Sequence, residues 1–183
     1  MLASFRFALV TALIGLAGST ASAQFGGGSL HGMRIAIGVD TPIGDFDQLA
    51  TTGFGLSIHT GLGEGGEAWS GRGSFGFDRF GGKGTLDNVQ FISYGFDIVH
   101  RSRPSWYQFG GITLNQTTYN YQSSSQAVQG AARNGSNFGF DGGIGVDFGS
   151  DGGTRTFVEF AATTLFTGTK NSSWFPVRFG LRF

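Results

Sequence analysis

From about residue 33 to the end of the chain, large apolar side chains alternate with glycine, small or polar side chains in one segment after another. The last segment shows this most clearly. Its apolar face carries Phe175, Val177, Phe179, Leu181 and Phe183. Successive side chains of a β-strand point to opposite faces of a sheet, whereas a helix repeats about every 3.6 residues. The pattern therefore predicts an all-β chain in which each strand has one apolar face and one face of small and polar residues.

Eight segments share this pattern, and each is close to the length that a tilted strand needs to cross a bilayer. They lie at about 33–40, 53–62, 69–77, 90–100, 106–114, 138–148, 155–166 and 175–183. The first links alternate in length: 41–52, 78–89 and 115–136 are long, whereas 63–68, 101–105 and 149–153 are short. Short turns at one end and long loops at the other are typical of bacterial outer-membrane barrels. We therefore predict an eight-stranded antiparallel up-and-down transmembrane β-barrel over residues 33–183, located in the bacterial outer membrane.

The first 23 residues predict a cleavable signal peptide. Arg6 supplies a positive charge, residues 7–17 are apolar, and Ala21-Ser22-Ala23 is a small-residue cleavage site. As a helix, this apolar run would be too short to cross the hydrocarbon core of a membrane. Residues 24–32 are then expected to form a flexible leader ahead of the barrel.

Glycine and phenylalanine are both abundant, with 34 and 20 residues among 183. The interior of an eight-stranded barrel is just wide enough for side chains to fill it, so bulky apolar residues from every strand would overfill it. If they faced inward, the exterior would be largely glycine with few charges, which is a poor surface for a soluble protein. We therefore expect the apolar face to contact the lipid bilayer of the outer membrane, with its lipopolysaccharide.

The opposite face carries a set of charged residues that this orientation places in the lumen. They are Arg34, Asp40, His59, Arg72, Asp97, Asp141, Asp147, Glu159, Arg178 and Arg182. A lone charge in a narrow lumen is costly, so we expect these groups to pair or to meet trapped water. Two interpretations follow. The network is either a polar plug that fills the interior or a gated, narrow ion path.

Aromatic residues near the segment ends suggest contacts at the membrane boundary and in the loops. Trp69, Trp106 and Tyr107 lie near the predicted short turns, and Trp174 lies on the long-loop side, so we predict these four as interfacial aromatics. The longest link, 115–136, is polar and almost uncharged. Its two tyrosines, Tyr119 and Tyr121, are predicted as loop contacts to a surface ligand that the sequence does not identify.

Several classes of site are not expected. Lysines and arginines number 12, as do aspartates and glutamates, and lysine occurs only at Lys83 and Lys170, so we expect no binding of nucleic acid. The chain has no cysteine, and its three histidines lie on separate segments, so we expect no cofactor and no metal cluster. His100 and Ser102 have a spacing that a hydrolase could use, but they fall at a short turn. We therefore expect no enzymatic activity and assign no catalytic residue.

The signal peptide, the eight alternating segments and the C-terminal FPVRFGLRF resemble the small outer-membrane β-barrel proteins of the OmpA/OmpX kind. The resemblance extends over the region after the signal peptide but lies in pattern rather than in a long motif. It includes no peptidoglycan-binding domain. It implies that Phe175, Val177, Phe179, Leu181 and Phe183 form the signal read by the outer-membrane barrel assembly machinery during biogenesis.

These observations favour a structural or adhesion-type surface-contact role for an integral outer-membrane barrel. A narrow passive pore for ions or small solutes is the alternative, and a lipid A-modifying enzyme is a second alternative.

Overall fold

The computed structural model describes residues 32–62, 68–122, 135–149, 153–167 and 171–183. The predicted signal peptide (1–23) and nearly all of the predicted leader (24–32) lie outside these residues, so both stay predictions. The barrel lies within the compact unit His31–Phe183.

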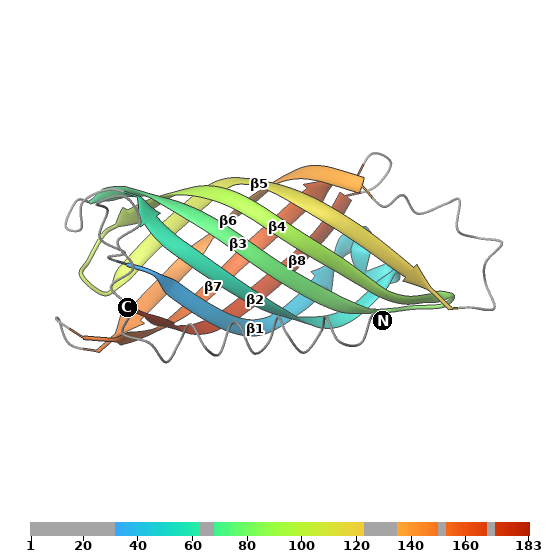
Figure 1. Ribbon diagram of the computed structural model, residues 1–183, viewed down its shortest axis with the longest axis horizontal. Helices are drawn as coiled ribbons and strands as arrows, with labels where there is room; N and C mark the ends of the chain where they lie inside the picture. The colour runs from blue at the N-terminus through green and yellow to red at the C-terminus, as the bar shows by residue number, and fades with distance from the viewer. Residues whose placement is uncertain (1–31, 63–67, 123–134, 150–152, 168–170) are drawn as a thin grey trace, which may run out of the picture. The chain divides into compact units, whose positions relative to one another are not determined.

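Eight antiparallel strands form a closed barrel in which each strand pairs with the next and β1 pairs with β8 (Figure 1). The strands are β1 (Arg34–Ile43), β2 (Ala50–Leu62), β3 (Trp69–Gly82), β4 (Leu86–Arg101), β5 (Trp106–Tyr121), β6 (Gly135–Phe148), β7 (Arg155–Phe166) and β8 (Asn171–Arg182). Closure leaves no strand edge unpaired along the shared height of the wall, which a strand in hydrocarbon requires. The predicted eight-stranded fold is confirmed.

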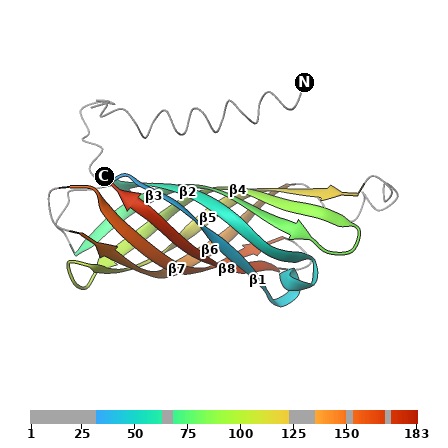
Figure 2. The ribbon, with the colours of Figure 1, turned by 90° about the horizontal axis from the view of Figure 1, so that it is seen from below.

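The two ends of the barrel differ. We name the end where β1 begins and β8 finishes the terminal end, and the opposite end the loop end. At the loop end a short 3₁₀ helix, η1 (Gly44–Gln48), joins β1 to β2 (Figure 2). Its Phe46 is only 1% exposed, because it packs against side chains of the barrel wall. Part of the predicted long link 41–52 is therefore a structured element.

Two other predicted long links are much shorter than expected. β3 continues to Gly82 and β4 starts at Leu86, so most of 78–89 is strand, and β5 extends to Tyr121. The register of β4 with β3 and β5 continues through this region, with a bulge between Leu86 and Asn88. The prediction failed because the pattern inverts here. Val89 and Phe91 face inward, so the apolar face no longer points outward.

The outer surface carries the large apolar side chains, which confirms the predicted orientation of the two faces. On β8 the residues from Phe175 to Phe183 alternate outward, and Phe179 is 56% exposed. At about 3.3 Å per residue this run covers about 26 Å of strand. A tilt of about 40° makes that about 20 Å along the barrel axis. This is close to the ~25 Å apolar band of outer-membrane barrels. Among the described residues, no helix is long and apolar enough to cross a membrane.

The interior is not polar throughout, which corrects the expectation that bulky apolar side chains stay outside. Near the loop end, Phe46, Phe80, Phe91 and Trp174 pack together inside the barrel. Phe91 stacks on Trp174 with ring centroids 4.9 Å apart, and Phe46 meets Phe80 edge-on at 5.0 Å. We name these four residues the aromatic cluster. The interior accepts them because neighbouring inner positions are occupied by small residues, such as Ala50 and Gly53.

Candidate functional site

The interior of the barrel brings together His59 of β2 and charged side chains of every other strand except β5. The structure places the ten predicted lumen residues on inward faces, eight of them buried and Asp141 and Arg182 half-buried. Sequence reasoning missed Asp78 and Tyr107, which belong to the same interior. Asp78 had been assigned to a loop, although it continues the inward face of Arg72, Ser74 and Gly76 on β3.

At the terminal end, three arginines surround one carboxylate. Asp147 of β6 accepts two hydrogen bonds from Arg34 Nη2, at 3.0 and 3.1 Å. It also accepts one from Arg182 at 2.9 Å and one from Arg101 at 3.2 Å. Asp147 and Arg34 are buried, whereas Arg101 and Arg182 are partly exposed. This end of the interior therefore carries more positive than negative charge.

Glu159 of β7 is the centre of a second group. It accepts hydrogen bonds from Arg72 Nη1 at 2.6 Å, from the Tyr107 hydroxyl at 2.7 Å and from Arg34 Nη1 at 3.4 Å. Arg34 also donates to the Tyr107 hydroxyl. Arg72 also donates a hydrogen bond from its Nε to Asp97 at 2.7 Å. Glu159 thus links the pair at Asp97 to the cluster at Asp147.

Arg178 of β8 forms the third group. Its two terminal nitrogens donate to Asp40 of β1 and Asp78 of β3, each at 2.5 Å. All three side chains are buried. A buried arginine needs such partners, because an unpaired charge is costly in a low-dielectric interior. Removing one partner of a buried ion pair costs on the order of 3 to 5 kcal/mol.

Glycines on the inner face allow these side chains to meet. The register puts Gly145 between Tyr107 and Glu159, and puts Gly38 and Gly55 between Arg178 and Asp78. A Cβ added at Gly145 would collide with the Tyr107 ring, and one at Gly55 would collide with both Arg178 and Asp78. The long side chains therefore run over strands that present no side chain at that level.

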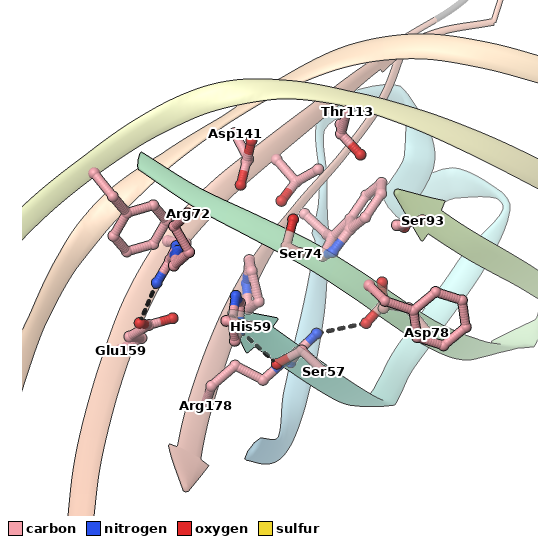
Figure 3. A pocket seen from close by; sticks show the side chains of 17 residues that line it. Ser57, His59, Arg72, Ser74, Asp78, Ser93, Thr113, Asp141, Glu159 and Arg178 are labelled. Carbon is pink, nitrogen blue, oxygen red and sulfur yellow. Dashed lines mark hydrogen bonds and ion pairs between the residues drawn. The ribbon is translucent and has the colours of Figure 1, made fainter. Parts of the chain in front are cut away.

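A cavity of about 90 Å³ lies in the middle of the interior (Figure 3). Its lining includes Arg72 of the second group and Arg178 of the third. It also includes the polar residues His59, Ser74, Thr113 and Asp141. His59 Nε2 is 3.0 Å from Ser57 Oγ, and its Nδ1 has no hydrogen-bond partner in the described part of the chain. This volume has room for several waters, because about 10 to 15 Å³ of such space is enough to hold one.

Above the cavity, towards the loop end, the interior has two sides. The aromatic cluster fills one side. The other side, along β5, carries the buried polar residues Thr113, Asn115 and Thr117. Asn115 donates to Thr113 Oγ1 at 3.0 Å and accepts from Ser93, and Thr117 accepts from Asn137 at 2.7 Å. Side chains therefore occupy the loop end of the lumen on both sides.

Two of the four predicted interfacial aromatics were wrong. Tyr107 and Trp174 are each 1% exposed and lie inside the barrel, whereas Trp69 and Trp106 are 61% and 46% exposed near the terminal end. Neighbouring residues of a strand point to opposite faces, so Trp106 and Phe175 facing outward turn Tyr107 and Trp174 inward. That Trp69 and Trp106 meet lipid headgroups stays a prediction.

The structure also changes the interpretation of the two predicted loop contacts and of the spacing between His100 and Ser102. Tyr119 and Tyr121 lie on β5 rather than in a loop, and both pack half-buried against the apolar core that contains the aromatic cluster. His100 packs against Trp69 with ring centroids 4.3 Å apart, at the terminal end. In the described ranges, no group of three or more His, Asp or Glu side chains is placed to hold a metal ion.

The apolar residues of the last strand are exposed along β8, and Leu181 is 41% exposed. β8 closes the barrel by pairing with β1 from Ser173 to Arg182. Recognition of these residues by the assembly machinery stays a prediction.

No family model matches the sequence, and neither does any curated protein. Solved structures do match its fold. The Ail attachment invasion locus protein of Yersinia pestis matches with a TM-score of 0.53 and 17% identity, covering 84% of this chain and 99% of Ail. Neisserial surface protein A matches with a TM-score of 0.52 and 12% identity, covering 82% of this chain and 95% of that protein. Both are small outer-membrane barrels, so the resemblance to such proteins is confirmed at the level of the fold.

Proposed function

We propose that this chain is an integral outer-membrane barrel whose interior is a plug and whose loop end makes contacts at the cell surface. The observation that carries the proposal is the filled interior. The ion-paired groups occupy the terminal end and the middle, and the aromatic cluster with the polar residues of β5 occupies the loop end.

Extension of the wall beyond the apolar band supports the surface-contact part of the proposal. On the outer face of β5, apolar Ile112 and Leu114 are followed by Gln116 and Thr118, and all four are exposed. β4 changes in the same way, from Ile92 to Gln90. These strands therefore reach past the lipid-facing band and present amides and hydroxyls to water.

The exposed polar surface is a wall of strands rather than the two tyrosines predicted at first. Asn120 donates to the buried Asn88 at 2.8 Å, and Gln90 donates to the same oxygen at 2.9 Å, so hydrogen bonds order the half-buried amides of this face. Ordered polar surfaces bind with a smaller loss of side-chain entropy than mobile ones. The name of Ail, attachment invasion locus protein, adds support through the shared fold.

Two experiments test the two parts separately. We expect the refolded barrel to give no ohmic conductance steps in planar bilayers, because side chains block both ends of the lumen. We expect Gln116→Ala with Thr118→Ala, on the exposed outer face of β5 near the loop end, to reduce adherence of cells to host matrix while the barrel keeps its faster gel mobility before boiling. Gln108→Ala, on the same face near the terminal end, is the matched control. Unchanged adherence in the double variant would contradict the surface-contact role.

The polar side of the loop end favours the narrow pore as a second candidate. Thr113, Asn115 and Thr117 form a buried polar line from the cavity towards the loop end. A pore would follow this line, so conductance steps that disappear in Asn115→Leu but persist in Gln116→Leu, on the outer face, would establish it in place of the plug.

A further inference from the structure

Two carboxylates lie at one level of the inner wall, and one of them, Asp141, lines the central cavity. The register places Asp97 of β4, Gly111 of β5 and Asp141 of β6 at one level of the wall. Because Gly111 carries no side chain, the Asp97 carboxylate can lie over β5, where a Cβ at Gly111 would collide with Asp97 Oδ1; Asp141 stands on the other side of Gly111. One oxygen of each, Oδ1, is buried and has no hydrogen-bond partner within the described residues.

Hydroxyl groups face the same space. His59, Ser74, Gly95 and Thr113 form the next inward row on β2 to β5. Gly95 has no side chain at this level. The other three side chains line the cavity together with Asp141 (Figure 3). His59 is 7% exposed, and its unpartnered Nδ1 offers a further lone pair at this cavity in the neutral tautomer whose proton is on Nε2. Oxygen atoms therefore dominate the polar lining on this side.

The charges around the cavity do not balance. Arg178 is shared by Asp40 and Asp78, and Arg72 is shared by Asp97 and Glu159, while Asp141 makes no ion pair among the described residues. Three carboxylates and two arginines line the cavity, and these arginines are also shared with Asp40 and Asp97. Arg34, which reaches Glu159 at 3.4 Å, is also held by Asp147. Uncompensated negative charge in a low-dielectric interior is costly, and either a bound proton or a bound cation relieves that cost.

We propose that the central cavity binds a small hard cation at Asp141, with Asp97 behind it and the hydroxyls of Ser74 and Thr113 beside it. Hard cations such as Ca²⁺ and Mg²⁺ take oxygen ligands and keep several waters where the protein supplies only one or two carboxylates. The cavity volume of about 90 Å³ fits an ion that retains a few of its waters. The inference does not depend on the surface-contact role, because it concerns only how the plug is neutralised.

The test uses Tb³⁺ as a hard-cation probe, added while the full barrel refolds from EDTA-treated, lipopolysaccharide-free material in detergent. Trp174 lines the same cavity, so its excitation should sensitise the emission of a bound Tb³⁺. We expect saturable emission that Ca²⁺ or Mg²⁺ displaces and that Trp174→Phe abolishes. Asp141→Asn should weaken binding by at least about tenfold, the lower end of what perturbing metal-site residues costs.

Asp87→Asn, which changes an exposed carboxylate on β4, is the matched control and should bind as the unmodified chain does. A closed barrel migrates faster in a gel when it has not been heated. If the Asp141→Asn variant lacks this faster mobility, and so has not folded, Thr113→Val replaces it in the test and should weaken Tb³⁺ binding severalfold. The proposal is overturned if emission does not saturate, or if the folded variants bind as tightly as the control. It is also overturned if infrared spectra show a protonated carboxyl that Asp141→Asn removes and that Ca²⁺ does not displace.

Discussion

Replacing Glu159 by glutamine tests whether the buried charge network holds the barrel together. The side chain keeps its shape but loses the negative charge that Arg72 meets at 2.6 Å and Arg34 at 3.4 Å. Arg72 would keep only Asp97, and Arg34 would keep Asp147. Removing one partner of a buried ion pair costs about 3 to 5 kcal/mol. Since glutamine still offers an oxygen to Tyr107, we expect a loss near ~3 kcal/mol in the free energy of unfolding.

The measurement is equilibrium unfolding in urea from lipid vesicles, followed by tryptophan fluorescence and by gel mobility without boiling. Asp87→Asn is the control, because that carboxylate is exposed, and it should stay within about 0.5 kcal/mol of the unmodified barrel. Replacing both partners, in Arg72→Met with Glu159→Leu, should cost more than Glu159→Gln alone, because it also leaves the buried Asp97 without its arginine. A loss below about 1 kcal/mol in Glu159→Gln would refute this account of the interior.

Three further changes test the remaining parts of the structure by the same unfolding measurement. Gly145→Val should destabilise by about 1 to 3 kcal/mol by overpacking against Tyr107, and Tyr107→Phe in the same chain should not restore it, because the ring itself is the obstacle. Phe46→Ala should cost about 3 to 5 kcal/mol by opening the aromatic cluster, whereas Leu49→Ala, at an exposed neighbour, should have a much smaller effect; equal losses would show that Phe46 is not a core residue. Phe179→Arg should cost about 2 to 4 kcal/mol on the lipid-facing band, and Thr118→Arg, above the band, should cost close to nothing; the reverse order would place the membrane wrongly.

The strands and their lipid-facing side were predictable because a single physical rule covers them. A strand whose outer face meets acyl chains must alternate apolar residues with small or polar ones, and the segment from Phe175 to Phe183 does so without interruption. The same rule fails above the membrane. On β4, Gln90 faces outward and Phe91 inward, because the outer face there meets water and the inner face packs on the aromatic cluster. When the apolar face switches from outward to inward within one strand, the sequence pattern looks like the end of that strand.

The inward positions of Tyr107 and Trp174 were available from the sequence but were not used. Each is adjacent to a residue on the outward face, Trp106 and Phe175, and strand geometry then puts it inside. The preference of amphipathic rings for the membrane boundary was allowed to override that alternation. Asp78 is similar, since its inward position follows from Arg72 by counting in twos along β3.

The ion pairs themselves could not be predicted from local pattern. Arg178 meets Asp40 and Asp78, which lie 138 and 100 residues away in the chain, and the register of the closed barrel decides which side chains share a level. Glycine then decides which of them touch. Arg178 and Asp78 are three strands apart at the wall, and they meet because Gly38 and Gly55 stand between them. The glycine content of this chain therefore has a steric role. Bare positions on the inner wall give long charged side chains the room to reach one another, and a methyl group at Gly55 would separate a pair that the sequence places far apart.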